Sequence, residues 1–204
     1  MNSQPLQQYQ ALMETIRARL DLIAELRNGH GDDFARAESA AFHGRKVIEA
    51  IAFGCLVAVE NGLKHVPKDA KGKWNASDIF KSLSKKNLGV LPSPSEIRHA
   101  TVEEAQMHGA KATIEGIPSQ RLTSSELISI YERLHRWLHE LNPYVADGRD
   151  AFVANYSAGL WSDLTKIEMF IARHVTSIAG EAFFCVLRDK IDGKTKVGSL
   201  SKIL

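Results

Sequence analysis

The sequence has few cysteines and no two of them close together. Cys55 and Cys185 lie far apart along the chain, and each sits in an apolar stretch. A disulfide framework or a paired-cysteine zinc site requires closely spaced or numerous cysteines. Both kinds of site are therefore excluded. We expect the two thiols to be small buried side chains in a reducing compartment.

Long hydrophobic runs and a targeting segment are also missing. The first five residues contain no basic segment that leads into an apolar one, so no secretory signal is predicted. The longest apolar stretch, residues 47–59, is interrupted by Glu49 and is shorter than the roughly 18 residues that a membrane span requires. The sequence therefore predicts a cytoplasmic protein that has no membrane partner.

Several catalytic and cofactor motifs are absent as well. There is no glycine-rich phosphate loop, no Gly-x-Ser-x-Gly elbow, no Cys/His nucleophile arrangement and no dinucleotide fingerprint, so no cofactor is expected. The formal net charge of the 204-residue chain is only +2, which by itself favours no class of partner. With 44% hydrophobic and 25% charged residues, the composition is that of a globular domain with a core.

The first part of the chain shows the periodicity of amphipathic helices. One helix is predicted over residues 6–27, where apolar side chains recur every three or four positions. A second helix begins at Asp32 or Asp33, either of which can cap it, and ends near Glu60. Its second half is apolar on nearly every side, which is typical of the central helix of a bundle.

A short third helix is predicted after Asn75, which can cap it, and should end near residues 87–89. Trp74 is expected to pack onto Ile79 as a hydrophobic staple.

A capping-box sequence starting at Thr123 opens the clearest helix, which is predicted to continue to Leu141. The stretch from 90 to 121 contains three prolines and little periodicity. It is predicted to be a long connection with at most a short helix over 96–106.

The C-terminal part changes character. Residues 160–171 still fit one helical face, whereas β-branched and aromatic residues then become frequent. Short strands are predicted at residues 174–178, 182–188 and 195–200, and Asp192-Gly193 is predicted to form the turn between the last two.

Together these patterns predict a mainly α fold of α+β character. A bundle of four to five helices would occupy residues 1–143, followed by a C-terminal helix and a small antiparallel β-hairpin appendage, residues 144–204, packed on the bundle.

Arg45 and Glu49 are one helical turn apart in the second helix, at the start of its most apolar segment. A carboxylate there would be costly to bury without a partner. We therefore predict a structural ion pair between the two side chains.

His135 and His139 have the i, i+4 spacing of a metal-binding pair. No glutamate base follows the first histidine, however, and Arg136 lies between the two. No metal site is predicted for this reason. More often such a helix face is simply solvated.

A different chemistry needs only an arginine and a histidine. The imidazole can act as general acid and base on a ribose 2′-hydroxyl, while the guanidinium stabilises the charged phosphorane. Arg133 with His139 has a suitable spacing, and Arg36 with His43 offers a second pair on one helical face.

An all-helical bundle with Arg-x-x-x-Glu in a central helix, Arg45 to Glu49, resembles the HEPN superfamily of prokaryotic helical domains. A later helix in which Arg133 is followed by His139 strengthens this resemblance, which covers roughly residues 32–143. The resemblance implies a homodimer directed at RNA, either a metal-independent endoribonuclease toxin or a phage-defence effector, with an antitoxin as a protein partner. His139 would then be the acid and base, and Arg133 or Arg136 would stabilise the phosphate.

One stretch of the nearly neutral chain is rich in lysine. Lysines on a loop and helix can hold a phosphate backbone, and Trp74 within this run can stack on a base, although a solvated surface is the plainer interpretation. The predicted nucleic-acid contacts are Lys64, Lys68, Lys71, Lys73, Lys81, Lys85 and Lys86.

Two classes of function therefore remain open. The first is a HEPN-like RNA-directed protein, catalytic or merely RNA-binding. The second is a non-catalytic helical module whose 90–121 segment and β tail form a protein–protein surface, within a homodimer.

Overall fold

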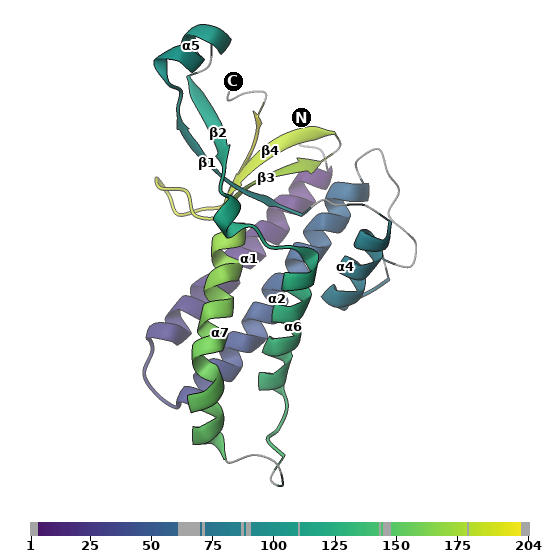
Figure 1. Cartoon of the computed structure of the whole chain (residues 1–204), viewed down its shortest axis with the longest axis vertical. Helices are drawn as coiled ribbons and strands as arrows, with labels where there is room; N and C mark the ends of the chain where they lie inside the picture. The colour runs from purple at the N-terminus through teal and green to yellow at the C-terminus, as the bar shows by residue number, and fades with distance from the viewer. Residues whose placement is uncertain are drawn as a thin grey trace.

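A computed structural model of the chain describes residues 4–60, 70, 72–86, 88, 91–109, 111–142, 144, 148–178 and 180–200. Long helices run side by side along the main axis of the molecule, and an antiparallel sheet of five strands lies across one end of them (Figure 1). This arrangement confirms the predicted mainly α fold with α+β character. Among the described residues, no helix combines the length and the apolar composition that a membrane crossing requires.

Helices α1 (Gln4–Asn28) and α2 (Asp33–Glu60) form the hairpin at the back of the bundle in Figure 1, and both lie close to their predicted bounds. Asp32 caps α2, because its Oδ1 accepts a hydrogen bond of 2.7 Å from the backbone N–H of Ala35. The apolar stripe of α1 is buried as its periodicity predicts. It consists of Tyr9, Met13, Ile16, Leu20 and Ile23.

Helix α4 (Ala76–Lys85) packs against both α2 and α6. The predicted cap is confirmed, because the side chain of Asn75 accepts a 2.9 Å hydrogen bond from the backbone N–H of Ser77. The predicted staple is wrong. Trp74 is 83% exposed, whereas Ile79 is buried in the core without it.

Helix α6 (Ser124–His135) begins with the predicted capping box, in which Thr123 and Glu126 exchange hydrogen bonds. It is shorter than predicted. A tight 3₁₀ turn, η2 (Arg136–Leu138), follows it, and the backbone of His139 is extended. The turn accompanies the burial of Trp137, whose ring contacts Phe34 and Phe152.

Helix α7 (Arg149–Ile171) completes the bundle and packs on α2 and α6. It includes the predicted helical face over 160–171 and begins well before it. The core lies between α1, α2, α6 and α7 and continues beneath the sheet. Both cysteines are buried there, and burial raises the pKa of each thiol to about 12.

The sheet has the order β2-β1-β3-β4-β5, with every neighbouring pair antiparallel. The five strands are β1 (Ser93–His99), β2 (Ala112–Gly116), β3 (Arg173–Ile178), β4 (Glu181–Val186) and β5 (Lys196–Ser199). The three strands of the C-terminal part are confirmed to within two residues. The predicted tight turn at Asp192-Gly193 is instead part of a longer connection over residues 187–195, in which Gly193 adopts a positive φ of 69°.

The largest correction concerns residues 90–121. This segment is not a mere connection, because β1, a short helix α5 (Val102–His108) and β2 form an arm that extends away from the bundle (Figure 1). Proline did not prevent the strand. Pro94 has no N–H to donate, but its carbonyl accepts a 2.8 Å hydrogen bond from the N–H of Ile117. The division of the chain at residue 143 stays a prediction.

Candidate functional site

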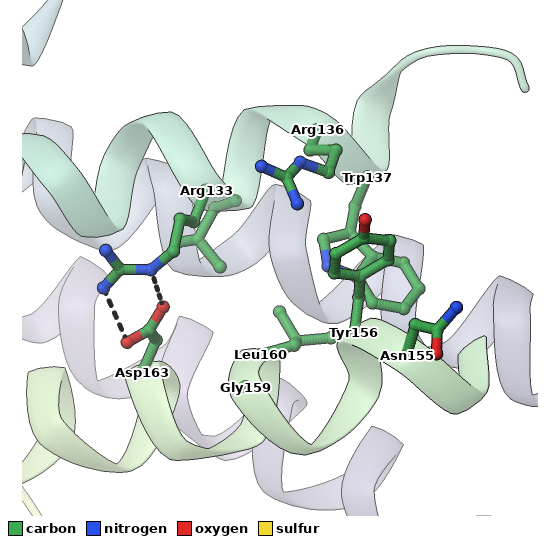
Figure 2. Close-up of a pocket in the computed structure, with 9 residues that line it drawn as sticks. Arg133, Arg136, Trp137, Asn155, Tyr156, Gly159, Leu160 and Asp163 are labelled. Carbon is green, nitrogen blue, oxygen red and sulfur yellow. Dashed lines mark hydrogen bonds and ion pairs between the residues drawn. The ribbon is translucent and has the colours of Figure 1, made fainter. Parts of the chain in front are cut away.

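Arg133 is held by a buried carboxylate on the neighbouring helix. Its Nε and Nη2 donate to the two carboxylate oxygens of Asp163, at 2.7 and 2.9 Å, as Figure 2 shows. The Asp163 side chain is only 7% exposed, whereas that of Arg133 is half exposed. This two-point ion pair fixes the guanidinium against α7.

His139 lies in a different environment. Its Nε2 is 3.0 Å from Nε2 of His135, and both imidazoles are exposed. His135 in turn contacts Arg45 of α2. Arg133 therefore serves the α6–α7 contact, and His139 belongs to a cluster between α6 and α2. Within the chain, the structure does not bring together the predicted catalytic pair of Arg133 and His139.

Arg136, the other predicted phosphate-stabilising residue, lies over the ring of Tyr156, with the guanidinium carbon 4.7 Å from the ring centre (Figure 2). In the described part of the chain it forms no ion pair. It lines, together with Arg133 and Asp163, a hollow of about 90 Å³ between α6 and α7.

The predicted ion pair between Arg45 and Glu49 is not direct. Between these two residues the structure places the hydroxyl of Tyr131, which accepts from Arg45 Nη2 at 2.6 Å and donates to Glu49 Oε1 at 3.0 Å. The carboxylate of Glu49 pairs with Lys46 instead, at 2.7 Å. Arg45 and Glu49 are one turn apart on α2. The phenol of Tyr131, which comes from α6, reaches between them, so its hydroxyl bridges the two side chains in place of a direct contact.

These contacts fix the proton positions of the two histidines. An arginine side chain can only donate, so Nδ1 of His135, which faces Nη1 of Arg45, must accept. Neutral His135 then carries its proton on Nε2 and donates it to Nε2 of His139. His139 is left with an accepting Nε2. Arg45 therefore donates a hydrogen bond to His135, and His135 donates one to the exposed imidazole of His139.

The electrostatics agree with this assignment. Partial loss of hydration lowers the pKa of His135. Electrostatic interactions, first with the guanidinium of Arg45 and then with His139, lower it further, which favours the neutral accepting form. Burial raises the pKa of the Tyr131 hydroxyl above its usual value. The phenol therefore stays protonated and able to donate to Glu49.

The second predicted pair, Arg36 and His43, is also separated. Arg36 Nη1 donates to the carbonyls of Leu26 and Gly29 at 3.0 and 2.8 Å and so holds the end of α1. His43 lies 3.1 Å from Arg19 instead. Burial, and next the charge of Arg19, lowers the pKa of His43.

The lysine-rich stretch is only partly described. Lys64, Lys68 and Lys71 lie outside the described residues. Lys73 donates to the hydroxyl of Ser82 at 3.0 Å. The remaining three lysines, Lys81, Lys85 and Lys86, are exposed on α4 or directly after it.

Within the described ranges, no three histidine, cysteine, aspartate or glutamate side chains form a group that could hold a metal ion. His135 and His139 alone supply two nitrogen ligands, fewer than the three protein ligands of a catalytic zinc site.

Sequence reasoning missed how Arg45, Tyr131 and His135 come together. The signal that could have revealed it is the spacing of Tyr131, His135 and His139, four residues apart on one helical face. The same residue also fits the apolar stripe of its helix, and its ring is buried. Comparison of the chain with protein-family models, with curated proteins and with solved structures gives no significant match.

Proposed function

We propose that this chain is a HEPN-like RNA-directed protein that cleaves RNA without a metal ion at the Arg45–histidine cluster. This cluster consists of Arg45, Glu49, Tyr131, His135 and His139. The observation that carries the proposal is the contact of the Arg45 guanidinium with an imidazole that is itself bonded to a second, exposed imidazole. A fixed cation beside two imidazoles in opposite hydrogen-bonding roles is what phosphodiester transesterification requires.

In the reaction, the 2′-oxygen forms a bond to phosphorus while one imidazole takes its proton. His139 suits this role, because its ring is exposed and its Nε2 can take the proton once the hydrogen bond from His135 to this nitrogen is released. The bond from phosphorus to the 5′-oxygen breaks, and an imidazole returns a proton to that oxygen. The products are a 2′,3′-cyclic phosphate and a 5′-hydroxyl. Arg45 lies on the same side of α6 and stabilises the extra negative charge of the phosphorane.

Glu49 and Tyr131 support Arg45 rather than touch the substrate. The side chain of Glu49 is only 14% exposed, and it accepts from Tyr131, which in turn accepts from Arg45. A guanidinium held from behind in this way keeps its remaining N–H groups in a fixed direction. Such preorganisation is the usual source of electrostatic catalysis.

The resemblance adds further proposals to this one. A HEPN-like ribonuclease would act as a toxin or as a phage-defence effector, as a homodimer, in the cytoplasm and under the control of an antitoxin. The lysines Lys73, Lys81, Lys85 and Lys86, together with the exposed ring of Trp74, would contribute RNA contacts. These lysines carry no base-specific information, so they would strengthen binding to any RNA.

The test is cleavage of a labelled RNA by the purified chain in the presence of EDTA. Wild-type protein should yield 2′,3′-cyclic phosphate ends. His139→Ala and Arg45→Gln should each reduce the rate at least a hundredfold, as general acid–base and electrostatic groups typically do. Thermal unfolding of each variant verifies that it is folded.

A matched control is His43→Ala, which removes another partly exposed histidine that also lies beside an arginine. It should cleave at the wild-type rate. If wild-type protein leaves RNA intact over a broad pH range, or if the His43 and His139 variants are equally impaired, cleavage at this cluster is refuted.

One observation favours a second candidate, a non-catalytic module that binds a second copy of the chain. The arm formed by β1, α5 and β2 carries three exposed apolar side chains, Ile97, Val102 and Met107, of which the last two are 74% exposed. Isolated exposed apolar residues are ordinary, but a group of them on one projecting element is typical of an interaction surface. In this case the wild type would sediment as a dimer without cleaving RNA. The double substitution Val102→Glu/Met107→Glu would give a monomer with an unchanged melting temperature.

A further inference from the structure

Two adjoining hollows follow the contact between α6 and α7, and a third lies beside them where α7 faces Arg27 of α1. The first has a volume of about 90 Å³ and shares Arg133 with the second, which has a volume of about 310 Å³. The second shares Lys166 with a third, open hollow beside Arg27 and Trp161. We call these three hollows together the α6–α7 groove. Tyr156 and Lys166 line it ten residues apart on α7, so it is roughly 15 Å long.

The charge of the groove is positive. Four cationic side chains line it, Arg27, Arg133, Arg136 and Lys166, against two acidic ones, Asp163 and Glu126. Both acids are already engaged.

Asp163 is bonded to Arg133, and Glu126 accepts from the N–H and hydroxyl of Thr123 in the capping box. Of the cations, Arg136 and Lys166 form no ion pair in the described part of the chain. The charge of Lys166 contributes to lowering the pKa of Glu126, after the hydrogen bonds from Thr123, but neither cation is held by a carboxylate, so both can contact an anionic ligand.

Aromatic rings support two of these cations. Arg136 lies over Tyr156, and Arg27 lies 5.2 Å from the ring centre of Trp161. Figure 2 shows Arg136 and Tyr156 at one end of the first hollow, and the pair of Arg133 with Asp163 at the other. A guanidinium plane held on a ring can contact a phosphate through its N–H edge or stack on a base through its face.

We propose that the α6–α7 groove binds a single strand of RNA and leads it to the Arg45–histidine cluster. The phosphates would contact Arg136, Arg133 and Lys166 in turn. A length of about 15 Å accommodates about four nucleotides at the stacked spacing of 3.4 Å. Only an unpaired strand can stack its bases on the aromatic and guanidinium faces that line this groove.

The position of Arg136 connects the groove to the cluster. It directly follows His135, so the two side chains leave the helix about 100° apart with a rise of about 1.5 Å. A strand that leaves the groove at Arg136 therefore reaches the exposed imidazoles of His135 and His139 around the end of α6. This inference rests on the proposed function, because it gives the RNA substrate of that cluster its path and its single-stranded form.

The test is binding of an oligonucleotide that cannot be cleaved, measured by fluorescence anisotropy at several salt concentrations. The probe is 2′-O-methyl oligouridine of roughly 12 nucleotides, a length within the usual site sizes. The variant is Arg136→Gln/Lys166→Gln, which removes two charges that hold no carboxylate. We expect at least a tenfold weaker Kd, and a salt dependence that is shallower by about 1.4, since each phosphate contact on a single strand contributes about 0.7.

The matched control is Lys190→Gln/Lys194→Gln, which removes two exposed lysines from the connection between β4 and β5. It should change the Kd less than twofold. The inference is overturned if the groove variant behaves like this control, or if an RNA duplex of the same length binds as tightly as the single strand. Displacement of the oligonucleotide by polyglutamate at equal charge concentration would likewise overturn it, in favour of an acidic protein partner.

This assay separates the two proposals, because binding is measured without cleavage. If the groove variant loses affinity while wild-type protein cleaves no RNA, the groove stands and the ribonuclease proposal fails. If RNA is cleaved and the groove variant binds normally, the groove inference alone fails.

Discussion

The hydroxyl of Tyr9 donates a hydrogen bond of 2.7 Å to Nε2 of His174, although 165 residues separate the two in the chain. The direction follows from the other ring nitrogen. Nδ1 lies 2.9 Å from the carbonyl oxygen of Ile171, which can only accept, so Nδ1 carries the proton. Both side chains are buried. This bond joins α1 to β3 and holds the first helix against the sheet.

The first prediction is a loss of stability in mild acid. Burial lowers the pKa of His174 from 6.5 to about 4, so the unfolded chain takes up a proton at a higher pH than the folded chain does. The contribution of this residue is fully present above pH 6.5 and is lost as the pH falls toward 4. From the titration of His174 alone, we expect the free energy of unfolding to be about 2 kcal/mol lower at pH 5 than at pH 7.5. Urea unfolding at the two pH values measures the difference.

His174→Gln provides the control, because glutamine does not titrate. It should be less stable than wild type at pH 7.5 but should lose about 2 kcal/mol less between the two pH values. Tyr9→Phe should keep the acid sensitivity and cost about 1–3 kcal/mol at neutral pH, because Nε2 then lacks its donor. An equal pH slope in wild type and in the His174 variant would show that other groups cause the acid sensitivity.

The second prediction compares two glycines in helix interiors. A Cβ at Gly44 would lie 2.4 Å from Leu164 Cδ2 and 3.0 Å from Leu134 Cδ1, whereas a Cβ at Gly159 would meet nothing within 4 Å. Alanine gains about 1 kcal/mol over glycine in a helix, and overpacking costs about 1–3 kcal/mol. Gly159→Ala should therefore stabilise the protein by about 1 kcal/mol, and Gly44→Ala should destabilise it by about 1 kcal/mol. Thermal unfolding shifts of the same sign would contradict this.

The helices of the bundle were predictable because local signals specify them. The caps at Asp32, Asn75 and Thr123 all form, and the apolar stripe of α1 is buried. The arm was not predictable from such signals. Pro92 and Pro94 suggest a loop locally, yet Pro94 occupies a strand position where its carbonyl is used and no N–H is needed. Strand pairing between distant segments overrides local preference there.

The candidate site shows the same limit. An arginine and two histidines do come together, but they are Arg45, His135 and His139 and not the predicted pair of Arg133 and His139. Their partners depend on neighbouring helices that periodicity on one helix does not reveal. Asp163 on α7 binds Arg133, so Arg133 does not contact His139. The arginine that contacts the histidines is Arg45 on α2, which lies against His135.

The third prediction concerns Arg133 and Asp163. Arg133→Ala leaves a carboxylate that is almost fully buried without its partner, and we expect a cost of about 2–3 kcal/mol. The double substitution Arg133→Met/Asp163→Leu removes both charges and should be within about 1 kcal/mol of wild type. Urea unfolding measures both. If Arg133→Ala leaves stability unchanged, Arg133 is not the structural partner of Asp163 that this ion pair implies.

The fourth prediction concerns the hydroxyl between Arg45 and Glu49. Tyr131→Phe keeps the buried ring but removes the only atom that links these two side chains in the described structure. We expect a stability loss of about 1 kcal/mol, and a cleavage rate reduced about tenfold, corresponding to about 1.4 kcal/mol of lost orientation.

The Kd for uncleavable RNA should change little, because Tyr131 holds Arg45 from behind and does not face the substrate. Glu49→Gln is the matched control. Its amide oxygen can still accept from the phenol, so its rate should fall less than that of Tyr131→Phe. A positioning residue lowers the rate of the chemical step while RNA binding and folding persist. If the cleavage rate, the RNA affinity and the stability of both variants fall in parallel, Tyr131 therefore contributes to packing alone.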